Sequence, residues 1–274
     1  MKTQRIHIMQ TPAIIWGAPS EKVYLYIHGQ GGYKEEAEAF AGIACRHSCQ
    51  VLSIDLPGHG ERKTEAGSFV PWHVVPELLS VMNYIRLHWP HVSLCANSIG
   101  AWFSLLGLES RWLEECLMVS PVPDMERLIL NMMAQADVSE ERLKREQVIR
   151  TSFGQTLSWE YLTYTRTHPV TRWEAPTYIL YGGADNLIER SAVDRFTRQF
   201  NCSQRQCRHF INNRRVGYLH YHCIVPFTFG YKLCSFSDQH IYIAPPTSTP
   251  RGFAMLCARR TSSVFNSTTR PSRP

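Results

Sequence analysis

The sequence predicts an α/β protein built on a mostly parallel sheet with crossover helices. Over the first 200 residues, short apolar runs alternate with stretches of helical periodicity. Glycine-rich or proline-rich turns follow several of the apolar runs, at the points where strands are expected to end. The chain has 274 residues, 44% of them hydrophobic, so it is long enough to bury a sizeable core.

The predicted elements follow in order along the chain. The strands are short apolar runs at residues 23–27 (VYLYI), 51–54 (VLSI), 91–95 (HVSLC), 116–119 (CLMV) and 177–181 (TYILY). The helices carry apolar residues near helical spacing and cover residues 35–45, 72–88, 101–108 and 191–200. This alternation of strand and helix is typical of parallel strands joined by crossover helices.

Between residues 124 and 169 the strand signal disappears and helices are expected instead. Asp137 or Ser139 can cap a helix whose first turn carries Glu140 and Glu141. Such an insertion between two strands usually covers the active edge of a sheet. We therefore expect a helical cap at residues 121–173.

The net charge of +6 is unevenly distributed along the chain. Residues 1–200 hold 19 basic and 22 acidic side chains, a net charge of −3. Residues 201–274 hold 10 basic side chains and one acid, Asp238, a net charge of +9. We therefore expect a core at residues 1–201 and a divergent, basic, Cys-rich segment at residues 202–274 with little packed structure at its end.

The cysteines divide in the same way. Those of the first region look like ordinary buried thiols of a cytosolic protein, namely Cys45, Cys49, Cys95 and Cys116. Those of the second region are Cys202, Cys207, Cys223, Cys234 and Cys257. With nearby histidines they offer zinc ligands, but no C-x2-C pair is matched by a second one, so we predict no metal site.

Cellular location is predicted from hydropathy as well as from cysteine use. No stretch approaches the roughly 20 apolar residues that span a bilayer. Residues 1–10 are too polar for the apolar part of a signal peptide. We expect a cytoplasmic protein without membrane association.

Ser98 is the first candidate for chemistry. It lies in residues 94–101 (LCANSIGA), between a predicted strand and a predicted helix, with Ala96 and Gly100 two positions to either side. A nucleophilic serine on a strained strand-to-helix turn needs small residues there, because larger side chains would collide with the strand and the helix. The backbone N–H of Ile99, at the start of the helix, would then face a developing oxyanion.

A second glycine-rich segment follows the first predicted strand, at residues 28–32 (HGQGG). Its glycines let the backbone approach a substrate closely, and the Gln30 N–H is the expected second oxyanion donor. The segment does not fit a phosphate-binding loop, because no Gly-Lys-Ser/Thr follows it. We expect His28 to hold this loop by hydrogen bonds, and His59 to be a structural residue of its own loop.

Residues 21–200 resemble the α/β-hydrolases. The resemblance rests on four motifs that occur in that family's order: HGQGG at 28–32, IDLPGHGER at 54–62, ANSIGA at 96–101 and YGGADNLI at 181–188. It implies Ser98 as nucleophile, Gln30 and Ile99 as oxyanion donors, and Asp185 as the acid that follows a late strand. The helical stretch at 124–169 corresponds to the family's lid or cap.

Asp185 also has a physical argument of its own. A carboxylate on a turn that leaves a strand can orient a neighbouring imidazole and stabilise its cation. An alternative is that Asp185 merely forms a turn before Asn186. Asp55 and Asp124, which also follow strands, are competing candidates for the acid.

The general base is the least defined part of the site. The chain order requires a histidine after Asp185, and the candidates are His209, His220 and His222, at 24, 35 and 37 residues beyond it. His209 is nearest to the expected spacing. None has a Gly-His or Glu-His context, and the change of composition near residue 201 suggests a replaced or frame-shifted terminus.

These observations favour a serine hydrolase that cleaves a small acyl ester, thioester or amide through an acyl-enzyme, without metal or organic cofactor. Its partner is a small-molecule acyl substrate, and the oligomeric state is open. The alternative is a catalytically impaired hydrolase-like protein whose base is absent or misplaced. Binding of nucleic acid by the basic segment is a third hypothesis, which the scattered positions of its basic residues do not favour.

Overall fold

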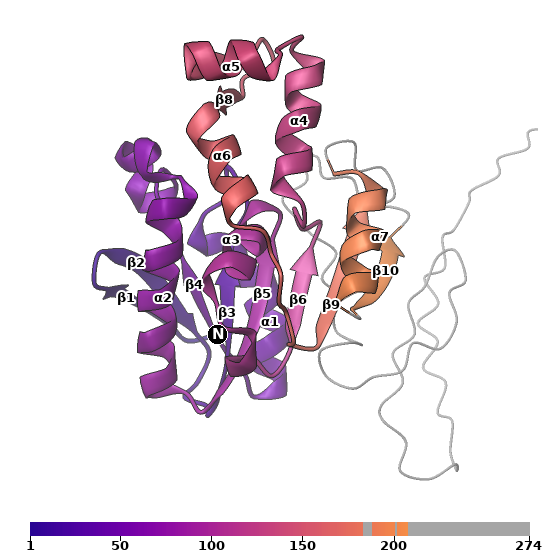
Figure 1. The fold of residues 1–274 in the computed structure, drawn as a ribbon. Helices are drawn as coiled ribbons and strands as arrows, with labels where there is room; N and C mark the ends of the chain where they lie inside the picture. The colour runs from indigo at the N-terminus through magenta and orange to yellow at the C-terminus, as the bar shows by residue number, and fades with distance from the viewer. Residues whose placement is uncertain (183–187, 201, 208–274) are drawn as a thin grey trace, which may run out of the picture.

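The computed structural model describes residues 1–182, 188–200 and 202–207. A sheet of eight strands in the order β1-β2-β4-β3-β5-β6-β9-β10 runs through the molecule (Figure 1). Its strands are β1 (Thr3–Ile8), β2 (Thr11–Trp16), β3 (Lys22–Ile27), β4 (Gln50–Ile54), β5 (His91–Asn97), β6 (Cys116–Val119), β9 (Thr177–Gly182) and β10 (Ser203–Cys207). Strand β2 is antiparallel to both β1 and β4, and every other neighbouring pair is parallel, so the predicted mostly parallel sheet is confirmed.

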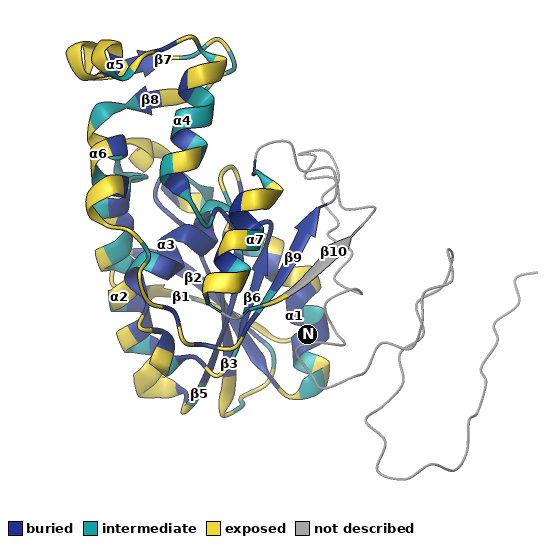
Figure 2. Cartoon of the chain, turned by 45° about the vertical axis from the view of Figure 1, so that its right-hand side comes forward, coloured by how far each residue is buried: buried dark blue, intermediate teal, exposed yellow. Residues whose placement is uncertain are grey.

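Helices cover both faces of the sheet (Figure 2). The core on one face includes residues of α2 (Pro71–His88), α3 (Ile99–Gly107) and α7 (Arg190–Gln199), and α1 (Glu38–Ala44) packs on the other. Short 3-10 helices complete the body at Lys34–Ala37, Cys45–His47, Gly60–Ser68 and Ser110–Trp112. Because the central strands are buried on both faces, they appear in the sequence as continuous apolar runs.

The segment between β6 and β9 contains α4 (Met125–Gln135), α5 (Glu140–Glu146), β7 (Val148–Arg150), β8 (Thr156–Ser158) and α6 (Trp159–Thr167). We call residues 121–173 the cap segment; it rises beyond the sheet edge toward which β6 points (Figure 1). Ser139, and not Asp137, caps α5 by accepting a hydrogen bond from the Arg142 N–H. The hairpin of β7 and β8 was not expected, since three-residue strands leave almost no periodic pattern.

Three strands of the main sheet were also missed, and each lies at or near a sheet edge. Strand β1 is mostly exposed and therefore lacks an apolar run. Strand β2 contains Pro12, and a proline within a run of residues argues against a strand. Strand β10 has the polar sequence SQRQC but pairs in parallel with β9. The main sheet therefore continues past residue 201.

Within the described part of the chain, no helix is both long enough and apolar enough to cross a membrane.

Candidate active site

Ser98 occupies a strained turn between β5 and α3. Its backbone angles are φ 50° and ψ −119°, a conformation that residues with a side chain rarely adopt. Its N–H donates to the Val119 carbonyl at 2.9 Å, and its own carbonyl accepts from the N–H groups of Ala101 and Val122 at 3.1 and 3.2 Å. These bonds hold the half-buried serine at the point where the strand ends, so the turn geometry expected from the sequence is present.

Two glycines permit the packing around this turn. A Cβ atom at Gly100 would lie 2.4 Å from the carbonyl oxygen of His28, so no larger residue fits there. A Cβ atom at Gly29 would lie 3.2 Å from the Cβ of Ser98, because the loop after β3 passes directly against the serine. Gly29 and Ser98, which are 69 residues apart in the sequence, therefore meet at one place.

The two expected oxyanion donors, Gln30 and Ile99, differ from their neighbour Gly31 in the hydrogen bonding of their backbone N–H groups. Among the described residues, neither the Gln30 N–H nor the Ile99 N–H has an acceptor, whereas the Gly31 N–H donates to Nε2 of His59 at 2.8 Å. The Gln30 N–H and the Gly29 carbonyl belong to one planar peptide, and that carbonyl accepts from the Gly32 N–H at 3.1 Å. The hydrogen bond that holds the Gly29 carbonyl therefore also sets the direction of the Gln30 N–H.

His28 holds the same peptide from the side of the sheet, as expected. Its Nδ1 lies 2.8 Å from the Gly29 carbonyl, and its Nε2 accepts from the Leu56 N–H at 3.1 Å. Because Nε2 accepts, the proton of the neutral ring is on Nδ1, which donates to Gly29. Burial of the ring penalises the imidazolium and lowers the pKa of His28 to about 4, so the ring stays neutral at neutral pH.

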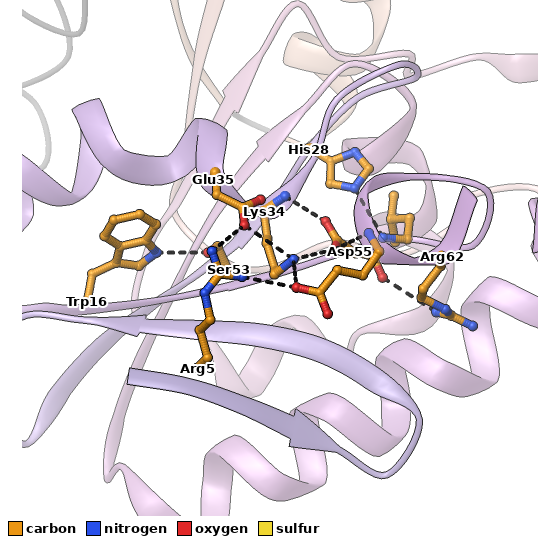
Figure 3. A network of polar contacts seen from close by, with 10 residues as sticks. Arg5, Trp16, His28, Lys34, Glu35, Ser53, Asp55 and Arg62 are labelled. Atoms are coloured by element: carbon orange, nitrogen blue, oxygen red, sulfur yellow. Dashed lines mark hydrogen bonds and ion pairs between the residues drawn. The ribbon is translucent and has the colours of Figure 1, made fainter. Parts of the chain in front are cut away.

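Asp55, one competitor for the catalytic acid, is engaged in a buried ion pair (Figure 3). Its carboxylate accepts from the Lys34 N–H at 2.8 Å, from Lys34 Nζ at 2.6 Å and from the Glu61 N–H at 3.0 Å. Burial opposes ionisation of Asp55, but these hydrogen bonds outweigh it and hold its pKa below the usual range. Asp55 thus joins the loop after β3 to the loop after β4, and its oxygens are used for that purpose.

Lys34 stays charged in this pair. Burial favours its neutral amine, but the hydrogen bonds to Asp55 and Glu61 outweigh burial and raise the pKa of Lys34. No local sequence pattern predicts this pair, because a lysine at the start of a helix is normally solvated. The one signal for it is an acid, Asp55, directly after a strand whose residues are all buried.

Asp124, the other competitor for the acid, is the N-cap of α4. Its Oδ1 accepts from the Arg127 N–H at 2.9 Å and its Oδ2 lies 3.2 Å from Arg195. Both oxygens are therefore occupied by contacts within the cap segment and with α7.

Asp185, His209, His220 and His222 lie outside the described residues. The strands that precede the first two are described: β9 ends at Gly182, three residues before Asp185, and β10 ends at Cys207, two residues before His209. Both strands are parallel to β5, through β6, so their carboxyl ends lie at the same edge of the sheet as Ser98.

The cap segment contacts the loop after β3 and the body helices. Nε2 of Gln30 lies 3.4 Å from Oε1 of Gln155, which is in the connection between β7 and β8. Tyr161 of α6 stacks on Trp102 of α3 with ring centroids 5.7 Å apart, and lies against Trp72 of α2 at 6.0 Å. These aromatic contacts dock α6 on the two body helices.

Among the described residues, no group of three or more His, Cys, Asp or Glu side chains is arranged to hold a metal ion. Five of the cysteines in the described part of the chain are free thiols: Cys45, Cys49, Cys95, Cys116 and Cys202. Several side chains of the second region that could in principle bind zinc lie outside the described residues: His209, His220, His222 and Cys223. Burial raises the pKa of the Cys95 and Cys116 thiols, so both are protonated at neutral pH.

No protein-family model matches the sequence, and no curated protein matches it at the level of sequence. Solved structures do match the fold. Est1E from Butyrivibrio proteoclasticus, with ferulic acid bound, is 17% identical with a TM-score of 0.68, over 83% of this chain and 98% of that one. Mouse alpha/beta hydrolase domain-containing protein 10 is 10% identical with a TM-score of 0.65, over 82% and 96%.

The Pyrococcus furiosus esterase Pf2001 is 16% identical with a TM-score of 0.52, over 75% of this chain and 81% of that one. At these identities the likeness concerns the fold alone. The chain has the α/β-hydrolase fold.

Proposed function

We propose that this protein is a serine hydrolase that cleaves small acyl esters, or the related thioesters and amides, through an acyl-enzyme. Ser98 is the nucleophile, Asp185 and His209 complete the triad, and Gln30 and Ile99 supply the oxyanion N–H groups. The observation that carries the proposal is the turn at Ser98, packed against Gly29 beside two backbone N–H groups that have no acceptor among the described residues.

The chemistry follows from these groups. The Ser98 hydroxyl attacks the substrate carbonyl carbon while the histidine takes its proton, and the carbonyl oxygen becomes an oxyanion. The Gln30 and Ile99 N–H groups donate to that oxyanion; loss of one such donor typically costs about 3 to 4 kcal/mol of transition-state stabilisation. The histidine then protonates the departing alcohol, and water attacks the acyl-serine by the reverse route.

Strand topology supports the choice of Asp185 and His209. Each follows the carboxyl end of a parallel strand by two or three residues, and those strands lie on the same side of β5 in the sheet order. His220 and His222 are 13 and 15 residues beyond Cys207, so they need a longer connection to reach the same edge. The oxygens of the competing acids Asp55 and Asp124 are engaged in other contacts, which supports the choice of Asp185 over them.

The comparisons support ester substrates as the first to test. One of the matching structures, Pf2001, is described as an esterase, and another, Est1E, holds ferulic acid. We extend this to the present chain as the class of small acyl esters, without a choice of acyl group. The cap segment, which contacts Gln30 through Gln155, is the part expected to set that choice.

The test is hydrolysis of p-nitrophenyl esters from acetate to octanoate. We expect measurable turnover, a loss of kcat of at least about 1,000-fold in Ser98→Ala, and large losses in Asp185→Asn and His209→Gln. Ser104→Ala is the matched control. It removes a hydroxyl from α3, the helix that follows Ser98, and that hydroxyl donates to the Gly100 carbonyl. It should keep kcat within a few-fold of the parent.

Undiminished turnover in Ser98→Ala would overturn the proposal. Full activity in His209→Gln would reject that base only, and His220→Gln and His222→Gln would then be measured singly. A folded parent protein without turnover on any ester would favour the catalytically impaired alternative.

A further inference from the structure

His59 joins the two glycine-rich loops of the site. Its Nε2 lies 2.8 Å from the Gly31 backbone N, and its Nδ1 lies 2.8 Å from the Pro57 carbonyl oxygen. Because the Gly31 N–H can only donate, Nε2 is the acceptor, and the proton of the neutral ring is on Nδ1 and is donated to Pro57. The imidazole therefore bridges the loop after β4 to the loop after β3.

Gly31 is loosely packed against the other residues that the structure describes. The glycine has a φ of +79°, it is exposed, and a Cβ atom placed there would meet no other atom within 4 Å. Gln30, the preceding residue, is also exposed. Among the described residues, the imidazole of His59 is the group that hydrogen-bonds to the N–H of the peptide linking Gln30 to Gly31.

The peptide on the other side of Gln30, which links it to Gly29, is fixed separately. Its Gly29 carbonyl accepts from His28 and from the Gly32 N–H, as described above. Gln30 is therefore bounded by two anchored peptides: the Gly29 carbonyl sets the direction of the Gln30 N–H within their shared peptide, and the contact at Gly31 restricts rotation of the Gln30 backbone that would turn that peptide. His28 anchors one of these peptides and His59 anchors the other.

The His59 ring is itself supported from the side of the nucleophile. It packs edge-on against Phe69 with ring centroids 4.5 Å apart, and Phe69 packs edge-on against Phe103 at 5.4 Å. Phe103 is a fully buried residue of α3, the helix that begins directly after Ser98. A chain of ring contacts thus links His59, which bonds to the loop after β3, to α3, the helix that follows Ser98.

We propose that His59 is a positioning residue for catalysis: through the Gly31 N–H it aims the Gln30 N–H at the oxyanion formed on a substrate at Ser98. The proposal rests on the proposed serine hydrolase function. It assigns His59 no proton transfer and no contact with substrate. Its effect is exerted on transition-state stabilisation, because a misdirected donor stabilises the oxyanion less than an aligned one.

The experiment compares two substitutions of His59. His59→Phe keeps a ring against Phe69 but removes the acceptor, whereas His59→Gln offers an amide oxygen where Nε2 stood. His73→Phe, at an exposed position of α2, is the control for replacing a histidine by a ring. Thermal unfolding verifies that each variant folds, and His59→Leu, which also lacks an acceptor, substitutes for His59→Phe if that variant does not fold.

The first readout, exchange of the Gly31 amide proton measured by NMR, requires no activity. We expect exchange to accelerate about tenfold or more in His59→Phe, and to stay near the parent rate in His59→Gln and His73→Phe. Equal Gly31 exchange in the parent and in His59→Phe would overturn the proposal, whatever the protein's activity.

The second readout is kinetic. We expect both the rate of labelling by a fluorophosphonate and kcat for a p-nitrophenyl ester to fall about tenfold or more in His59→Phe, with KM little changed, and to recover in His59→Gln. Unchanged labelling and kcat in a variant whose Gly31 amide is released would overturn the positioning role, as would a change confined to KM. No labelling of the folded parent protein would instead overturn the proposed function, and with it the catalytic role of His59.

Discussion

The body side and the cap side of the site are held by different kinds of polar contact. Beneath the loops after β3 and β4, Lys34 and Asp55 pair with exposed fractions of 1% and 0%. On the cap segment, Arg166 pairs with Glu126 and Glu140, and the three side chains are 35%, 39% and 41% exposed. Breaking a buried pair leaves an uncompensated charge, whereas exposed pairs are screened by water and salt. The loop that carries Gln30, a proposed oxyanion donor, is thus held by a buried pair, whereas the helices of the cap segment are joined to one another by exposed pairs.

The largest expected effect comes from breaking the buried pair. Asp55→Asn removes the negative charge but keeps the shape of the side chain, so Lys34 is left buried without its main partner. We expect the free energy of unfolding to fall by about 3 to 5 kcal/mol, measured by urea denaturation. Glu35→Gln is the matched control, because Glu35 is a partly exposed partner of the same lysine at 3.4 Å, and it should cost less than about 1 kcal/mol. Equal losses in the two variants would remove the distinction between the buried and the exposed contacts.

The next effect is a pH dependence on the body side. The pKa of His28 falls from its ordinary value near 6.5 to about 4 in the folded protein, so the unfolded chain binds a proton that the folded chain does not. The stability that this group contributes is therefore present above pH 6.5 and is lost as the pH falls through that value toward 4, by about 3 kcal/mol. Urea unfolding at pH 7, 6, 5 and 4.5 measures the loss. His28→Asn, which keeps a donor near Nδ1 but does not titrate, should be less sensitive over this range, and an equal slope in both proteins would contradict this interpretation.

A smaller effect, of opposite sign, is expected where the cap segment docks on the body. The hydroxyl of Tyr161 is buried and has no hydrogen-bond partner among the described residues, although its ring stacks on Trp102. Tyr161→Phe keeps the stacking and removes the unpaired hydroxyl, so we expect a gain of about 1 kcal/mol in unfolding free energy. Tyr164→Phe, on the same helix and without a buried unpaired hydroxyl, should change stability by less than that. Destabilisation by Tyr161→Phe would mean that the hydroxyl makes a favourable contact.

The smallest effect is expected on the cap segment itself. Arg166→Gln removes both of its ion pairs, but all three side chains are partly exposed. We expect a loss below about 1 kcal/mol that shrinks further in high salt, measured by urea unfolding at low and high ionic strength. A loss as large as that of Asp55→Asn would mean that the exposed pairs of the cap segment stabilise the protein as much as the buried pair of the body, which would contradict the difference between the two.

Sequence reasoning predicted the parts of the fold whose signal is local or continuous. The central strands β3, β4, β5, β6 and β9 are buried on both faces and therefore stand out as apolar runs. The turn at Ser98 was predictable because close packing demands glycine at position 100. The hydrogen bonds of His28 were expected from its place in the glycine-rich loop.

The missed features are those that depend on partners far along the chain. Strand β10 is polar, and it is a strand because β9 offers it a free edge to pair with. The pairing of Lys34 with Asp55 and of His59 with Gly31 spans 21 and 28 residues, and no local pattern encodes such contacts. Asp185 and the three candidate histidines lie outside the described residues, so their roles remain predictions.

The most direct test of the proposed chemistry is to trap the acyl-enzyme. The protein is mixed with a p-nitrophenyl ester, quenched in acid within the first turnovers, and analysed by intact mass and by peptide mapping. We predict a mass increase of one acyl group, located on Ser98 and absent from Ser98→Ala, whereas Ser104→Ala still forms it. Hydrolysis of the ester without an acyl group on Ser98, or with one on another residue, would contradict the account.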